Sequence, residues 1–255
     1  MAKIFAIATN KGGVLKTTLT VNLGAELSKK HRVLLLDTDP QSNVAGTFGI
    51  IESEVPATLY DCLARNKNLK EAIVNVSENL DIVYTGKEMN SFTGENPDDG
   101  SEISPLRIKE LIDSVKEQYD YILIDTAPAQ NSVTIQALLA VDEVIIPFHP
   151  EGYSVSSIVA TLEAVTEIKD VTKKKLKVNS FVITKYESKS YTHKKVLNDI
   201  LSVANRLGIR VISTKVPQTA SGGRSIVEEQ KPTVLAKRWY KLKATYANVA
   251  NEVFK

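Results

Sequence analysis

The feature that most constrains the fold of this chain is the segment from Thr9 to Thr18, which reads TNKGGVLKTT. A strand-like apolar stretch, Lys3 to Thr9, precedes it, and apolar residues at helical spacing, from Leu19 to Leu27, follow it. Backbone amides at the start of a helix can point at phosphate oxygens, and the helix dipole favours negative charge there. The sequence therefore predicts a phosphate-binding loop between a first strand and a first helix.

The residue types in this loop suit a nucleoside triphosphate with Mg²⁺. Gly12 and Gly13 let the chain turn tightly and approach a phosphate closely. Lys16 is predicted to bridge the β- and γ-phosphates, and the Thr17 hydroxyl to coordinate Mg²⁺. A glycine turn that happens to precede a lysine-bearing helix is the plainer alternative, which the strand, loop and helix context disfavours. The residues predicted to contact the nucleotide here are Lys11, Gly12, Gly13, Val14, Leu15, Lys16, Thr17 and Thr18.

Two further segments place carboxylates directly after apolar strands. Asp37 and Asp39 follow the run Leu34 to Leu36, and alternation along an extended chain puts both side chains on one side. Asp125 follows Tyr121 to Ile124, an arrangement that holds Mg²⁺ directly or through water. For Asp39, a helix N-cap before a proline is the alternative.

Short runs rich in Val, Ile and Leu recur along the chain, and helical patterns separate most of them. This alternation indicates a mainly parallel sheet covered on both faces, because each parallel crossover needs a helix to return the chain. We predict a single doubly wound α/β domain over residues 1–255, with Asn90 to Pro105 as a surface loop. The predicted strands are Lys3 to Thr9, Arg32 to Leu36, Leu80 to Thr85, Tyr121 to Ile124, Glu143 to Pro147, Val178 to Thr184 and Arg210 to Ile212.

Cysteine content and hydropathy limit the compartment and the kinds of site. Cys62 is the only cysteine, so an internal disulfide and a cysteine-rich metal or cluster site within one chain are excluded. That usage suits a reducing cytoplasm. No apolar run approaches the roughly 20 residues that a membrane-spanning helix needs. We therefore expect a cytoplasmic protein.

The net charge of +2 hides an asymmetry along the chain. Residues 1–150 carry 13 Lys/Arg against 21 Asp/Glu, whereas residues 151–255 carry 19 against 9. This polarity suggests that the C-terminal half presents a basic surface to a polyanion. Scattered, solvated lysines are an equally open interpretation.

Lys11, before the glycine pair, gives the loop the form K-G-G-x-x-K-T, which resembles the deviant Walker A motif of the ParA/MinD group of P-loop ATPases. In that group the early lysine reaches the partner subunit's phosphates in a nucleotide-sandwich dimer. The resemblance implies this role for Lys11, an ATP-dependent homodimer, and ATP or ADP with Mg²⁺ as cofactors. A cation delivered in trans acts only once two subunits meet, as an arginine finger does. Leu15 departs from the group, whose members usually have glycine there.

The resemblance also assigns roles to other positions, and it covers essentially residues 2 to 253. It implies slow ATP hydrolysis in which Asp39 orients or activates the attacking water. Asp37 is implied to support the Mg²⁺ and water network beside Thr17 and Asp125. The segment that packs against adenine corresponds to Val216-Pro217, so the base contacts carried over are Pro217 and Thr219. The implied catalytic set is Lys11, Lys16, Asp37 and Asp39.

Several branches of the group remain to be compared. Iron proteins of the nitrogenase type need two cysteines per subunit, which Cys62 alone cannot supply. MinD-like membrane regulators end in a basic amphipathic helix, for which Lys237 to Lys255 is the candidate. A core-facing helix explains its apolar stripe at least as well, and Lys255 is the one cation in the last ten residues. A metabolic ATP-dependent ligase or amidase is a third possibility, but no side-chain nucleophile or substrate pocket stands out. The apolar stripe consists of Leu242, Tyr246, Val249 and Val253.

The resemblance favours the DNA-partitioning branch, in which the ATP-bound dimer holds nonspecific DNA on a basic surface. Only two residues precede the first predicted strand, so we expect no N-terminal helix-turn-helix domain. Site-specific DNA reading is then expected from a centromere-binding partner of the ParB type, which stimulates hydrolysis, and we expect a nucleoid-associated protein. The candidate DNA-binding residues are Lys185, Lys189, Lys194, Lys195, Arg224, Lys237 and Arg238.

Overall fold

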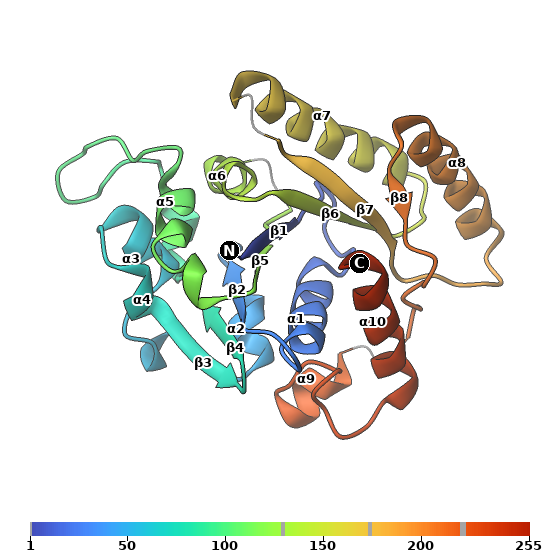
Figure 1. The fold of residues 1–255 in the computed structure, drawn as a ribbon, viewed down its shortest axis with the longest axis horizontal. Helices are drawn as coiled ribbons and strands as arrows, with labels where there is room; N and C mark the ends of the chain where they lie inside the picture. Colours follow the sequence, from blue (N-terminus) through green and yellow to red (C-terminus); the bar gives the residue numbers. More distant parts are fainter. Residues whose placement is uncertain (1, 129–130, 173–174, 220–222) are drawn as a thin grey trace.

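Eight strands form one sheet (Figure 1) in the part of the chain that the computed structural model describes, namely residues 2–128, 131–172, 175–219 and 223–255. They are β1 (Lys3–Ile7), β2 (Val33–Asp37), β3 (Ile73–Ser77), β4 (Leu80–Val83), β5 (Tyr121–Asp125), β6 (Glu143–Phe148), β7 (Lys177–Ile183) and β8 (Arg210–Val211). The order in the sheet is β3-β4-β2-β5-β1-β6-β7-β8. All neighbours are parallel except β3 and β4, which are antiparallel.

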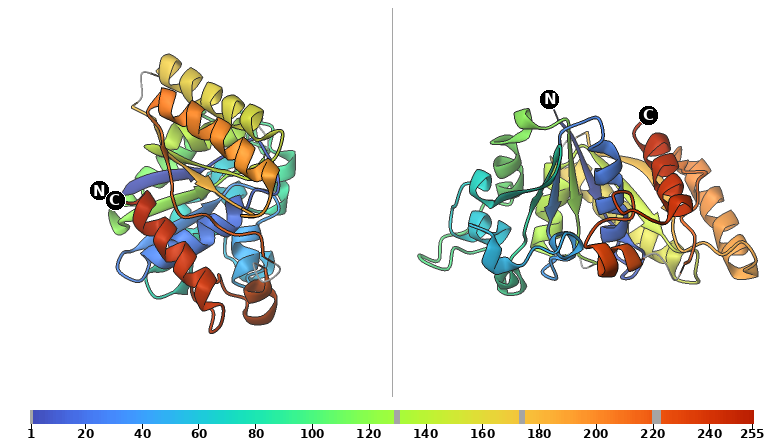
Figure 2. Two further views of the ribbon diagram at one scale, coloured as in Figure 1. Left: turned by 90° about the vertical axis from the view of Figure 1, so that its right-hand side faces the viewer. Right: turned by 90° about the horizontal axis from the view of Figure 1, so that it is seen from below.

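Helices cover both faces of this sheet (Figures 1 and 2). They are α1 (Lys16–Leu27), α2 (Asn43–Thr47), α3 (Leu59–Ala64), α4 (Leu69–Ala72), α5 (Arg107–Asp113), α6 (Ser132–Ala140), α7 (Ser154–Thr172), α8 (Tyr191–Leu207), α9 (Arg224–Glu229) and α10 (Tyr240–Val253). Apolar side chains of α1 and α10 pack on one face, whereas those of α5 to α8 pack on the other. The predicted doubly wound, mainly parallel α/β fold is confirmed.

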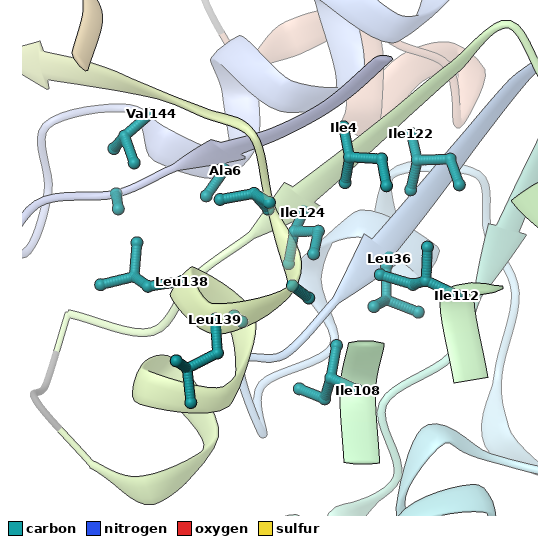
Figure 3. Packing of buried hydrophobic residues seen from close by; sticks show 14 of the residues in the cluster. Ile4, Ala6, Leu36, Ile108, Ile112, Ile122, Ile124, Leu138, Leu139 and Val144 are labelled. Carbon is teal, nitrogen blue, oxygen red and sulfur yellow. The ribbon is translucent and has the colours of Figure 1, made fainter. Parts of the chain in front are cut away.

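Alternation along the strands assigns each side chain to one of the two faces. On β1, Ile4 and Ala6 join one hydrophobic cluster, whereas Phe5 and Ile7 join the other. Figure 3 shows the first cluster, where side chains of the strands meet those of α5 and α6. Because both faces are buried, the central strands are apolar at almost every position, which is why the sequence revealed them.

One strand is absent from the predicted set. β3 is an antiparallel edge strand whose residues are half-buried or exposed. It begins at Ile73, directly after α4 ends at Ala72, so no turn residue separates the helix from the strand. The seven predicted strands are all present with bounds shifted by up to a few residues, and the first ends at Ile7 rather than Thr9.

The predicted surface loop, Asn90 to Pro105, is confirmed as a mostly exposed segment. It starts at the end of a 3₁₀ turn (Lys87–Ser91) and contains an isolated bridge between Glu95 and Glu102. In Figure 1 it projects beyond α5, away from α1 and β1.

The C-terminal helix α10 packs against α1 (Figure 1). Its apolar positions Leu242, Tyr246, Val249 and Val253 are all buried. The apolar stripe therefore faces the core, as the alternative to a membrane-binding helix predicted. No helix among the described residues is long and apolar enough to cross a membrane.

Candidate nucleotide site

Three adjacent strands bring the predicted loop and carboxylates to one edge of the sheet. The register pairs Asp125 with Ile7 on one side and with Asp37 on the other. Because these strands are parallel, their carboxyl ends lie together, which is where ligands of such sheets bind. The phosphate loop, Asp37 and Asp125 are thus neighbours, as the sequence predicted.

The phosphate loop folds around the side chain of Lys16, the first residue of α1. The Lys16 ammonium donates to the carbonyls of Thr9 and Lys11 at 3.2 and 3.1 Å. Burial lowers the pKa of Lys16, while the nearby Asp125 and Asp39 act in the opposite direction. A buried cation is therefore held at the centre of the loop by main-chain oxygens.

Leu15 is the N-cap of α1 and has left-handed backbone angles, φ 66° and ψ 33°. Glycine adopts this conformation without steric cost, whereas other residues pay about 1–3 kcal/mol. This strain is the physical consequence of the departure noted in the sequence. The Leu15 side chain offsets part of the cost, because it packs against the α1-side hydrophobic cluster.

Asp125 is fully buried at the end of β5 and lies beside two hydroxyls of α1. Its Oδ2 accepts from Thr17 Oγ1 at 2.6 Å, and its Oδ1 is 3.1 Å from Thr20 Oγ1. Burial is the main cause that raises the pKa of Asp125 to about 7. The hydroxyl of Thr17 and the carboxylate of Asp125 are oxygen donors of the kind that Mg²⁺ prefers, so the residues present fit this ion. Thr20 is not among the predicted site residues, although it lies one helical turn after Lys16.

Both carboxylate oxygens of Asp37 accept hydrogen bonds from backbone amides. Oδ1 accepts from Asp39 N at 2.9 Å, and Oδ2 accepts from Val44 N at 3.0 Å. Burial, and then repulsion by Asp125, raises the pKa of Asp37 well above its usual range. These contacts anchor the segment between β2 and α2, and thereby fix where Asp39 stands.

Asp39 lies on the wall of a cleft of about 560 Å³ that also exposes the phosphate loop. The side chain is half-buried, and its Oδ1 accepts from Gln41 N at 3.0 Å. Gly12, Lys16 and Thr17 line the same cleft. Pockets for small ligands usually measure about 300–1,000 Å³, so this cleft can hold the polyphosphate part of a nucleotide.

A second, smaller cavity of about 180 Å³ adjoins this cleft on the side of α10. Pro217 and Thr219, the two predicted base contacts, both line it. Tyr186 forms an isolated bridge with Pro217, which ties this wall to the segment after β7. The two predicted base contacts therefore line one narrow cavity beside the phosphate cleft.

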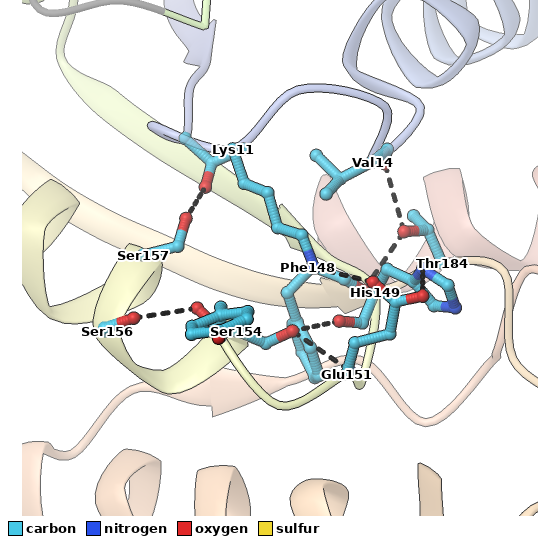
Figure 4. A network of polar contacts seen from close by, with 11 residues as sticks. Lys11, Val14, Phe148, His149, Glu151, Ser154, Ser156, Ser157 and Thr184 are labelled. Carbon is cyan, nitrogen blue, oxygen red and sulfur yellow. Dashed lines mark hydrogen bonds and ion pairs between the residues drawn. The ribbon is translucent and has the colours of Figure 1, made fainter. Parts of the chain in front are cut away.

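Lys11 behaves differently from Lys16, because its side chain leaves the loop (Figure 4). The Lys11 ammonium lies 2.8 Å from Glu151 Oε2, and His149 Nδ1 lies 3.3 Å from the other oxygen of Glu151. The hydrogen bond from Lys11 lowers the pKa of Glu151. Glu151 is not among the predicted site residues.

The seven basic candidates fall into three places. Lys189, Lys194 and Lys195 are exposed at the start of α8. Arg224, Lys237 and Arg238 are also exposed and lie around α9. In Figure 1, α10 separates α9 from α8. Lys185 stands apart, because it is half-buried and lines both the phosphate cleft and the smaller cavity.

A loop folded around a buried lysine at the end of β1, with hydroxyl and carboxylate oxygens beside it, defines a P-loop NTPase. A family model described as an AAA domain matches residues 2–178. The chain is also 34% identical over 203 residues to the sporulation initiation inhibitor protein Soj of Bacillus subtilis, which covers 78% of this chain and 79% of Soj. The chain belongs to the ParA/MinD-type P-loop ATPases.

Solved structures with nucleotides share this fold. A protein of Borrelia burgdorferi B31, described as a plasmid partition protein and bound to AMPPNP, is 27% identical with a TM-score of 0.79, covering 100% of this chain and 98% of that one. Cobyrinic acid a,c-diamide synthase of Mycobacterium smegmatis, with ADP and magnesium, is 24% identical with a TM-score of 0.79, covering 98% and 93%. The second likeness concerns the fold alone. ATP or ADP with Mg²⁺ is the cofactor of this fold.

Proposed function

We propose that this chain is a DNA-partition ATPase in which ATP drives a nucleotide-sandwich homodimer. The dimer binds nonspecific DNA, and hydrolysis stimulated by a ParB-type partner returns it to the free state. The observation that carries the proposal is the position of Lys11. Its carbonyl belongs to the phosphate loop, yet its ammonium lies outside, 2.8 Å from Glu151 Oε2.

The ion pair between Lys11 and Glu151 is partly exposed, since 24% and 49% of the two side chains are accessible. Exposed pairs contribute only about 0–1 kcal/mol, so little free energy holds the lysine in this position. A polyphosphate on a second subunit carries more charge than one carboxylate and can take the lysine over. Lys11 then completes the site only in a dimer, which makes ATP binding a switch for assembly.

Within one subunit, other residues supply the remaining steps. Lys16 neutralises the β- and γ-phosphates from the centre of the loop. Asp39, on the wall of the cleft, orients the attacking water and accepts its proton. Asp37 keeps Asp39 in place through its two bonds to backbone amides. Thr17 and Asp125 would hold Mg²⁺, which would neutralise charge on the phosphates.

The basic residues around α8 and α9 support the DNA-binding step. Six of them are exposed: Lys189, Lys194, Lys195, Arg224, Lys237 and Arg238. Only Arg238 lies near a carboxylate among the described ion pairs, 3.8 Å from Glu228. Phosphate contacts of this kind give weak, salt-sensitive binding, with Kd roughly 10⁻⁴ to 10⁻⁶ M.

The two alternative functions have less support. A membrane-surface regulator would need an exposed apolar stripe, but that of α10 is buried. A ligase or amidase would need a substrate pocket, and an apolar cleft of about 500 Å³ does lie between α6 and α7, beside Asn10. Among the described residues that line it, Glu167 is the one ionisable side chain. An amide-forming enzyme needs groups that bind a carboxylate substrate, and this lining offers no cation for it.

Co-sedimentation separates the partition function from the membrane-surface function. The protein is mixed with plasmid DNA, with anionic liposomes, or with neither, each with ATP and with ADP. Partition predicts ATP-dependent retention on DNA, loss of that retention as salt rises, and no retention on liposomes. Retention on liposomes but not on DNA would contradict the proposal and favour a membrane regulator.

A further inference from the structure

We propose that Lys185 is a nucleotide-binding residue that contacts the α-phosphate from within the same subunit. This role replaces the DNA contact predicted from its charge. The inference rests on nucleotide binding at this site, which is one part of the proposed function. It does not depend on dimerisation, on DNA or on a partner.

The backbone around Lys185 is fixed to the phosphate loop. Thr184 Oγ1 is 3.0 Å from both the carbonyl of Val14 and the carbonyl of Phe148, so it links β7 to the loop and to β6 (Figure 4). Lys185 itself has a left-handed backbone, with φ 50°. A lysine in this conformation carries strain of about 1–3 kcal/mol, and such strain persists where surrounding contacts enforce it. The contacts of Thr184 aim the next side chain at the loop instead of at solvent.

The Lys185 ammonium lies over the glycine part of the loop. It is 4.0 Å from the place where a Cβ on Gly13 would stand. Lys185 also lines both the phosphate cleft and the smaller cavity, a property it shares with Leu15, Thr18 and Ile226. Of these four shared residues Lys185 alone carries a charge, so it stands at the boundary between the two cavities as a cation.

The two lysines of the phosphate loop have partners, whereas Lys185 has no carboxylate partner among the described residues. Lys16 donates to two main-chain carbonyls, and Lys11 pairs with Glu151. Within the described part of the chain, no carboxylate oxygen lies within 4.0 Å of the Lys185 ammonium. Burial is the main cause that lowers the pKa of His149, and the positive charge of Lys185 lowers it further. A half-buried ammonium without an anion is suited to receive one from a ligand.

The order of groups in a nucleotide identifies that anion. With the base in the smaller cavity and the β- and γ-phosphates at Lys16, the ribose and the α-phosphate lie at the boundary where Lys185 stands. The α-phosphate is the charged group of that pair, and lysine binds phosphate as a point charge. AMP, ADP and ATP all carry this phosphate, so a contact there strengthens the binding of all three to the same extent.

Nucleotide titrations of the whole chain test this assignment. Fluorescent ADP and ATP analogues are titrated into the wild type, Lys185→Met, Lys185→Gln and Lys185→Arg, with AMP as a competitor. Lys177→Met is the matched control, because Lys177 is an exposed lysine at the start of β7, the strand that ends two residues before Lys185. A charge-assisted contact to phosphate is worth about tenfold in affinity. We expect Lys185→Met and Lys185→Gln to weaken ADP, ATP and AMP by that same factor, Lys185→Arg to retain most of the affinity, and the control to match the wild type.

Three results would overturn the assignment. If Lys185→Met and Lys185→Gln bind nucleotides within twofold of the wild-type affinity, Lys185 does not contact the α-phosphate. If only the affinity for ATP falls, Lys185 contacts the γ-phosphate instead. If nucleotide affinity is normal but DNA retention at saturating ATP is reduced, Lys185 is a DNA-binding residue, as its charge first suggested. Failure of the wild type to bind DNA at all would instead contradict the partition proposal and leave the nucleotide result intact.

Discussion

The nucleotide edge of the sheet and the basic surface of the C-terminal half use charge in opposite ways. At the nucleotide edge, Lys16, Asp37 and Asp125 are buried, and hydrogen bonds to main-chain or hydroxyl groups fix each one. On the basic surface, the cations around α8 and α9 are exposed and spread over separate elements. A single substitution should therefore have a large effect at the edge, whereas the surface should respond to the sum of its charges.

Lys16→Ala should have the largest effect, because a loss of nucleotide binding also removes the ATP-dependent dimer and hydrolysis. The variant removes the buried cation and leaves the carbonyls of Thr9 and Lys11 without their donor. We expect nucleotide affinity to fall by at least about 100-fold, since hydrogen bonds to charged groups contribute about 1.5–3 kcal/mol each. Calorimetric titration with ATP measures this. Lys30→Ala is the control, because Lys30 is an exposed lysine just after α1. If both variants lost the same nucleotide affinity, the effect would not be specific to the nucleotide edge.

Lys11→Ala should have the next largest effect, and a different one. Because its ammonium lies outside the loop, ATP binding by the monomer should stay within a few-fold of the wild type. The ATP-dependent dimer should be lost, and hydrolysis should fall by about 10³-fold, as for a cation supplied in trans. Light scattering after gel filtration, with ATP and with ADP, reports the dimer.

Glu151→Gln is the matched control for Lys11, because it removes the ion pair and keeps the lysine. This variant should still form the dimer with ATP. A Lys11→Ala protein that dimerises as the wild type does would show that the ammonium has no role across the interface.

On the basic surface, the double variant Lys194→Glu/Lys195→Glu should weaken DNA binding by about tenfold and reduce its salt dependence. Nucleotide affinity should not change, because both residues lie on α8, outside the two cavities. Lys67→Glu/Lys70→Glu places the same charge change on exposed residues of the acidic half. Fluorescence anisotropy with labelled DNA at several salt concentrations measures both. Equal losses in the two double variants would mean that net charge matters and the location does not.

Leu15 should give the smallest effect. Its left-handed backbone suits glycine, whereas its partly buried side chain packs against the hydrophobic cluster. Leu15→Gly loses the packing but relieves the strain, and Leu15→Ala loses the packing and keeps the strain. We expect the glycine variant to be more stable than the alanine variant by about 1 kcal/mol, measured by urea unfolding. The reverse order would mean that the backbone at this position is not strained.

How far the sequence predicts the molecule also differs between these regions. The edge was predictable because fixed geometry demands particular residues: glycines where the loop turns, Lys16 at its centre, and Asp125 at the end of a strand. The central strands were predictable because both faces are buried. β3 was not, since an edge strand that is only half-buried has a weaker apolar pattern.

Contacts between distant segments that no shared motif links could not be predicted. The pair of Lys11 with Glu151 joins residues 140 positions apart, and neither belongs to a pattern that requires the other. Lys185 is a similar case, because composition suggests a surface cation. Only the packing of β7 against the loop through Thr184 places it at the nucleotide site.

In the proposed cycle, ATP assembles a DNA-bound dimer, and hydrolysis at Asp39 releases it. The most direct measurement is the fraction of Asp39→Ala retained on DNA over time after a pulse of ATP, together with its rate of phosphate release. We expect the variant to bind ATP, to stay on DNA as a dimer and to release phosphate at least about 100-fold more slowly than the wild type. Phosphate release at the wild-type rate, or departure from DNA as fast as the wild type, would contradict it.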